Sequence, residues 1–128
     1  MSSFLIVILL SFTTIGYSQE WESIYSSNDG IEVFFKNQSK NLVWVKTTNV
    51  DVDKGDMLNS EIVKGQRIRL IKFNCQDKKM GIIATIEYDN NGEVIFSNQK
   101  EEILVDMEYP YPDTFNEFIL KKYCNSKK

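Results

Sequence analysis

The two cysteines, Cys75 and Cys124, are the residues of this chain that could form a covalent cross-link. Two cysteines allow a single internal pairing, and an oxidising compartment outside the cytoplasm favours that bond. The closed loop would hold about 50 residues, for which the chain-entropy model gives a stabilisation of about 4 kcal/mol. We therefore predict a Cys75–Cys124 disulfide, and two unpaired thiols are the alternative.

The chain has no histidine, so acid–base or metal chemistry would have to rely on its carboxylates. This removes the commonest general base, the commonest metal ligand and every nucleophile–histidine pair. The stretch from Asp51 to Asp56 is similar to the start of a calcium-binding loop, but its fifth position is Gly55 and its twelfth is Ile62, where such a loop has glutamate. We interpret it as a solvated acidic loop, and we predict a non-enzymatic protein with no metal and no cofactor.

One short stretch concentrates positive charge. Arg67, Arg69 and Lys72 are candidates for contact with an acidic or sulfated partner, and ordinary solvated charge is the alternative. The whole chain is mildly acidic, with a net charge of −3, so it has no global attraction to nucleic acid or to anionic lipid. We therefore expect a protein partner and no nucleic acid.

The first residues have the pattern of an export signal. The apolar run from Phe4 to Leu10 is too short to cross a bilayer, which takes about 20 apolar residues. Gly16 and Ser18 then supply the small residues that a signal peptidase requires. A signal peptide over residues 1–18 is therefore predicted, and a retained membrane anchor is the alternative.

Cleavage after Ser18 would leave one secreted domain over residues 19–128, with no membrane span. The intact mass of the exported protein is expected to correspond to a chain that begins at Gln19. A mature form that still carries the apolar run would contradict this prediction.

The domain alternates between apolar-rich stretches and polar turns, which is typical of β-strands. Most of the links are too short for a crossover helix, so neighbouring strands should be antiparallel. Asp89-Asn90-Asn91-Gly92 has the composition of a tight hairpin turn. The predicted strands are Trp21 to Tyr25, Ile31 to Lys36, Leu42 to Val50, Gln66 to Cys75, Met80 to Tyr88 and Val94 to Ser97.

Two stretches between these elements have weaker patterns. The long link from Asp51 to Gly65 is predicted to hold a short helix over Met57 to Val63. From Lys100 to Glu108, apolar residues alternate with polar ones, which predicts an edge strand.

The clearest helix lies at the C-terminus. Thr114 and Glu117 form a capping box. The residues at helical spacing that should make its apolar face are Phe115, Phe118, Ile119 and Tyr123. The predicted fold class is therefore α+β: a single antiparallel sheet of about six strands, with a C-terminal helix packed on one face and tethered by the disulfide.

The other face of the sheet should not be purely polar. Cys75 must point toward the helix that carries Cys124, and strand alternation then turns Trp44, Phe34 and Leu70 the other way. An apolar patch there predicts a homodimer or a ligand surface, and scattered surface apolar groups are the alternative.

An ordered set of short runs across nearly all of residues 19–128 resembles the surface-adhesin protein E-like domain. The runs are Trp21-Glu22-Ser23-Ile24, Val43-Trp44-Val45-Lys46, Phe73-Asn74-Cys75, Tyr88 to Val94, and Pro112-Asp113-Thr114 ending at Cys124. The resemblance implies a six-stranded antiparallel sheet with a disulfide-tethered helix. It also implies a bacterial envelope protein that binds host matrix or serum proteins and can dimerise.

The chain departs from this family in two ways. It has no lipidation cysteine after the apolar run, which puts lipid-anchored surface display in doubt. It also has no tryptophan in Glu101 to Leu104, where family members often carry one before the helix. No binding residue is transferred from the family.

Two functions are therefore expected. The first is a secreted, adhesin-like binding module, and the alternative is a periplasmic or envelope structural protein without adhesin activity. Either would be exported to the periplasm, the cell surface or the medium. The candidate binding residues are Trp44, Phe34, Leu70, Arg67, Arg69 and Lys72.

Overall fold

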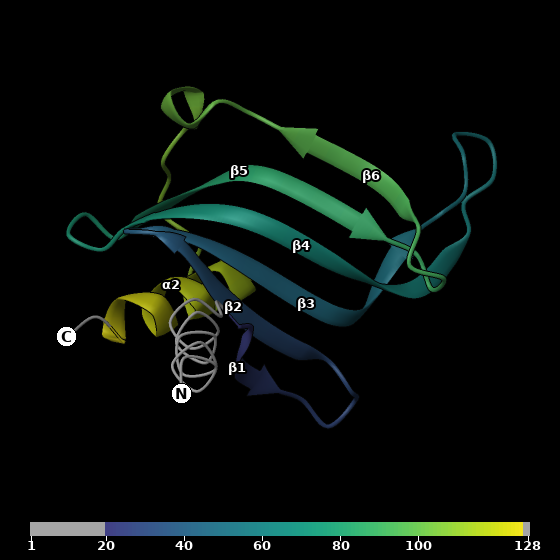
Figure 1. Cartoon of the computed structure of the whole chain (residues 1–128), viewed down its shortest axis with the longest axis horizontal. Coiled ribbons are helices and arrows are strands. Elements are labelled where there is room, and N and C mark those ends of the chain that lie inside the picture. The colour runs from purple at the N-terminus through teal and green to yellow at the C-terminus, as the bar shows by residue number, and fades with distance from the viewer. Residues whose placement is uncertain (1–19, 127–128) are drawn as a thin grey trace, which may run out of the picture.

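The computed structural model describes residues 20–126, so the predicted signal peptide lies outside the described residues. The strands are β1 (Glu22–Ser26), β2 (Glu32–Ser39), β3 (Leu42–Asp53), β4 (Ile62–Asn74), β5 (Lys79–Tyr88) and β6 (Val94–Gln99). They are followed by a 3-10 turn, η1 (Glu102–Leu104), and a helix, α2 (Phe115–Asn125). The strands form one antiparallel sheet in sequential order, and α2 lies against one of its faces (Figure 1). The predicted α+β class is confirmed.

Local turn chemistry produces this sequential order. Gly30, Gly92 and Asn41 all have positive φ, a conformation that glycine and asparagine adopt at low cost. In the β5–β6 hairpin, the Asp89 carboxylate accepts hydrogen bonds from the backbone N–H groups of Asn91 and Glu93, at 2.8 and 3.0 Å. Each strand therefore turns back directly beside the one before it.

The hydrophobic core lies between α2 and one face of strands β2 to β5. Alternate residues of each strand point to this face, and α2 adds three side chains to them. The core residues are Val33, Phe35, Val43, Val45, Ile71, Phe73, Met80, Ile119, Leu120 and Tyr123.

The apolar face predicted for the helix is partly wrong. Ile119 and Tyr123 are buried as expected, but Phe115 and Phe118 are 39% and 36% exposed. The helix is rotated so that Leu120 enters the core in their place. Phe118 instead lies at the rim, with its ring edge-on to Tyr25 at 5.5 Å between centroids.

The helix predicted over Met57 to Val63 is also wrong. β3 and β4 continue to pair as far as Asp53 and Ile62, so this link is a hairpin loop. The Asp53 carboxylate shapes the loop by accepting backbone hydrogen bonds from Gly55 and Glu61, both at 2.9 Å. Such side-chain bonds compete with helix formation.

The edge strand predicted from Lys100 to Glu108 is not formed. The stretch holds η1 and a single bridge between Met80 and Glu108. Val105 and the following residues lie against Gly81, where a side chain would collide with them. Because Gly81 leaves this space, the chain can cross β5 on its way to α2 rather than pair along β6.

Candidate functional site

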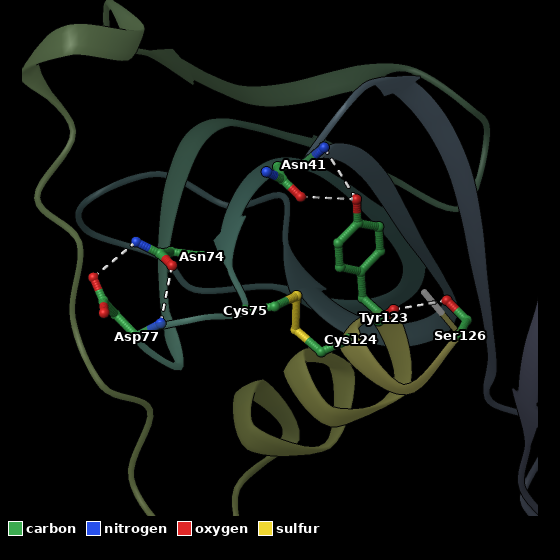
Figure 2. The surroundings of a disulfide bond; sticks show 7 residues. All are labelled: Asn41, Asn74, Cys75, Asp77, Tyr123, Cys124 and Ser126. Carbon is green, nitrogen blue, oxygen red and sulfur yellow. Dashed lines mark hydrogen bonds between the residues drawn. A yellow bond between two sulfur atoms is a disulfide. The ribbon is translucent and has the colours of Figure 1, made fainter. Parts of the chain in front are cut away.

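The disulfide joins the end of β4 to the last turn of α2, as predicted. The Cys75 and Cys124 sulfurs are 2.07 Å apart, and the two Cα atoms are 5.5 Å apart. Figure 2 shows Tyr123 beside it, rising from α2 toward Asn41. The Tyr123 hydroxyl accepts a hydrogen bond from the Asn41 backbone N–H at 3.0 Å and lies 3.3 Å from the Asn41 Oδ1. This end of the helix is thus held by a covalent bond, a buried ring and polar contacts.

The face of the sheet away from α2 brings the three apolar candidates together. Trp44 of β3 is directly opposite Leu70 of β4, and Phe34 of β2 lies diagonally from Trp44. All three side chains are partly buried. The Trp44 indole N–H donates to the Gln38 side-chain carbonyl at 3.0 Å, which fixes the plane of the ring.

Two lysines share this face and lie over its aromatic rings. The Lys46 ammonium is 4.6 Å from the centre of the Trp21 ring and 4.9 Å from that of Phe34. The Lys36 ammonium is 5.6 Å from the Trp21 ring. We call Trp21, Phe34, Lys36, Trp44 and Lys46 the lysine–aromatic surface.

Three members of this surface are not among the candidates predicted from the sequence: Trp21, Lys36 and Lys46. The signal for the lysines is present in the sequence, because Lys36 and Lys46 are each two residues from Phe34 or Trp44 and must share their face. Trp21 precedes β1, and its position depends on how the first strand joins the edge of the sheet.

The three basic candidates do not form one patch. Arg67 and Arg69 occupy alternate positions of β4 on the same face as α2, whereas Lys72 lies on the opposite face. Lys72 pairs with Glu102 of η1 at 3.3 Å, and Arg67 pairs with Glu87 of β5 at 2.6 Å. Arg69 remains the candidate cation without a salt bridge among the described residues.

Arg69 lies close to the start of α2. Its guanidinium carbon is 5.5 Å from the centre of the Phe115 ring, and its Nε is buried without a hydrogen-bond partner among residues 20–126. Burial, and then the nearby charge of Arg67, lower the pKa of the Arg69 guanidinium from its ordinary value. An arginine nevertheless stays charged at neutral pH.

The acidic loop after Asp51 has no metal-binding arrangement. Across the part of the chain that the structure describes, no group of three or more cysteine, aspartate, glutamate or histidine side chains could hold a metal ion. The Asp53 oxygens instead accept hydrogen bonds from the Ser60 hydroxyl and from backbone N–H groups, and these bonds lower the pKa of Asp53.

Neither helical element in residues 20–126 has the length and apolar character needed to span a bilayer. Comparisons of the chain with models of protein families, with curated protein sequences and with solved structures found no match.

Proposed function

We propose that this protein is an exported, non-enzymatic binding module that takes an acidic segment of a protein partner on its lysine–aromatic surface. The proposal rests on the surroundings of the Lys36 and Lys46 ammonium groups. Within residues 20–126 neither has a salt bridge, although the chain as a whole has a net charge of −3. Both are positioned over aromatic rings on a face that α2 does not cover.

Charge and shape on this face both favour an acidic protein segment. A lysine over an aromatic ring keeps its donors available on the side away from the ring. The neighbouring Trp44 and Leu70 add apolar area, and large aromatic side chains are enriched among the residues that dominate protein interfaces. Glu32, an acidic group on the same face, begins β2 opposite Thr48, four residues from Lys36, and it forms no salt bridge with either lysine.

The resemblance to surface-adhesin protein E-like domains supports the same class of function. On that basis we propose a host matrix or serum protein as the partner. The disulfide fits the proposed export, because such bonds persist in oxidising compartments.

Trp44→Ala is expected to weaken partner binding by more than about 1 kcal/mol, or roughly fivefold, while the fold stays intact. Lys46→Gln should also weaken binding, and binding by the unaltered protein should fall as salt is raised because exposed charges are screened. The measurement is a titration of the exported protein against immobilised matrix and serum proteins, with circular dichroism of each variant.

Phe96→Ala is the matched control, since this aromatic residue is 47% exposed and lies outside the lysine–aromatic surface. It should leave binding unchanged. If Trp44→Ala unfolds the domain and alters no association, or if the protein associates only with itself, the proposed function is wrong. Protease treatment of intact cells shows separately whether the protein reaches the cell surface.

A further inference from the structure

A hollow opens on the α2 face of the sheet, beside the N-terminus of the helix. Its volume is about 550 Å³, which is within the usual range of small-ligand pockets. Side chains from β1 to β4 and the first turn of α2 line it. We call it the arginine pocket, and the residues that matter to the argument are Tyr25, Val33, Thr47, Arg67, Arg69 and Phe115.

Arg69 is the group in this pocket that lacks an acceptor. The other arginine, Arg67, donates to the Glu87 carboxylate at 2.6 Å and lies 3.5 Å from the Asp51 carbonyl oxygen. Arg69 has no salt bridge to a carboxylate of residues 20–126, and its Nε, which is closed off from solvent, has no hydrogen-bond partner there. Leaving a charged donor unpaired while it is partly buried is costly. An oxygen-bearing anion in the pocket would supply a counter-charge and acceptors to the part of the guanidinium that lines it.

The start of α2 adds to the attraction for an anion. The first backbone N–H groups of a helix have no intrahelical acceptor and carry the positive end of the helix dipole. Phe115 and Asn116, the first two residues of α2, border the pocket. The Thr114 hydroxyl is already engaged, because it accepts from the Glu117 N–H at 3.3 Å. The helix dipole therefore adds to the attraction that the Arg69 guanidinium exerts on an anion, and Arg69 remains the main source of that attraction.

The charges that face the pocket favour an anion with a single charge. Arg67 is neutralised by Glu87, and Asp29 also lines the pocket. A hydrogen bond from the Ser27 hydroxyl, followed by backbone hydrogen bonds, lowers the pKa of Asp29, which therefore stays negative at neutral pH. Arg69 is the cation of this pocket without a salt bridge, and one guanidinium offsets one negative charge. A doubly charged phosphate costs more to take out of water than a monoanion, and the Asp29 carboxylate offers it no compensation.

Apolar groups make up much of the remaining wall, including Val33, Val50 and the ring of Phe115. We propose that the arginine pocket binds a monoanionic carboxylate carried on a short apolar stem. The Arg69 guanidinium holds the carboxylate in a forked pair of hydrogen bonds, and the stem lies against the apolar wall. The carboxylate can belong to a free small acid or to the C-terminus of a peptide. This site is on the opposite face from the lysine–aromatic surface, so it stands or fails independently of the proposed function.

The test uses N-acetyl-phenylalanine and its amide, which differ only at the carboxyl group. The acid is expected to bind with a Kd of about 1 mM, and the amide at least about tenfold more weakly. NMR titration of the unaltered protein should shift the backbone signals of Thr47, Phe115 and Asn116 and the Arg69 Nε–H signal. A tripeptide that ends in phenylalanine, with a free or an amidated C-terminus, then distinguishes the two sources of the carboxylate. If the tripeptide with the free C-terminus binds more tightly than N-acetyl-phenylalanine, the natural ligand is the C-terminus of a peptide.

Arg69→Met keeps the apolar stem of the side chain and removes its donors, so it should weaken binding of the acid at least about tenfold. Lys121→Gln removes an exposed positive charge of α2 and should leave binding unchanged. Inorganic phosphate should compete poorly. Equal binding of acid and amide, equal binding of phosphate, or signal shifts confined to residues outside the pocket would each overturn the proposal, and the titration of the unaltered protein decides this even if Arg69→Met does not fold.

Discussion

Replacing Tyr123 by alanine is expected to lower the free energy of unfolding by about 3 to 5 kcal/mol, as for other fully buried aromatic residues. The Tyr123 side chain is 1% exposed. Its ring stacks on Phe73 with centroids 4.7 Å apart and meets Phe35 edge-on at 6.5 Å. The substitution would leave a cavity between α2 and the sheet that the disulfide prevents from closing freely. Chemical denaturation followed by circular dichroism measures the change.

Two further variants separate the contribution of the Tyr123 hydroxyl from that of its buried ring. Tyr123→Phe keeps the ring and removes the hydroxyl contacts with Asn41, at an expected cost of about 1 kcal/mol. Phe118→Ala removes a residue of similar size from the same helix, but one that is 36% exposed, and should cost about 1 kcal/mol. A larger loss for Phe118→Ala than for Tyr123→Ala would show that the helix docks on the sheet through a different face.

Removal of the Cys75–Cys124 bond is the second change with a large expected effect. The bond closes a loop over a sequence separation of 49 residues, and the chain-entropy model gives a loss of about 4 kcal/mol when it is absent. The double variant Cys75→Ser/Cys124→Ser is therefore expected to melt roughly 15 to 20 °C below the unaltered protein. The effect comes mainly through the unfolded chain, which gains freedom when the loop opens.

Adding a thiol reductant to the unaltered protein and to the double variant gives a matched control for this prediction. It should lower the melting temperature of the unaltered protein to about that of the double variant, and it should leave the double variant unchanged. Peptide mapping without reduction should recover the two cysteines in one linked fragment. Free thiols in the native exported protein, or a double variant as stable as the parent, would contradict the prediction.

The sheet could be predicted from the sequence because its determinants are local. Alternation of apolar and polar residues selects strands, and the asparagine and glycine residues at positions 41, 30 and 92 accept the positive φ of the turns. The Thr114–Glu117 capping box likewise marks the start of α2, where the Glu117 carboxylate also accepts from the Asp113 N–H at 3.0 Å. Each of these signals is contained within a few residues.

The loops that were predicted wrongly lack such a local signal. The Met57 to Val63 stretch has helix-compatible residues, but Asp53 binds backbone groups as far away as Glu61 and closes a hairpin instead. The stretch before α2 alternates like a strand, but it crosses β5 because Gly81 leaves room for Val105. Both outcomes depend on a partner outside the stretch itself.

By itself, the sequence determined the sheet, the capped helix, the pairing of the cysteines and the shared face of Trp44, Phe34 and Leu70, because periodicity and turn chemistry act over short distances. Only the tertiary structure decided the rotation of α2, which buries Leu120 and leaves Phe118 at the rim. It also placed Lys36 and Lys46 over the Trp21 ring, and it brought the Arg69 guanidinium into contact with the Phe115 ring. These contacts join segments far apart in the chain, and their geometry follows from how the helix and the first strand dock on the sheet.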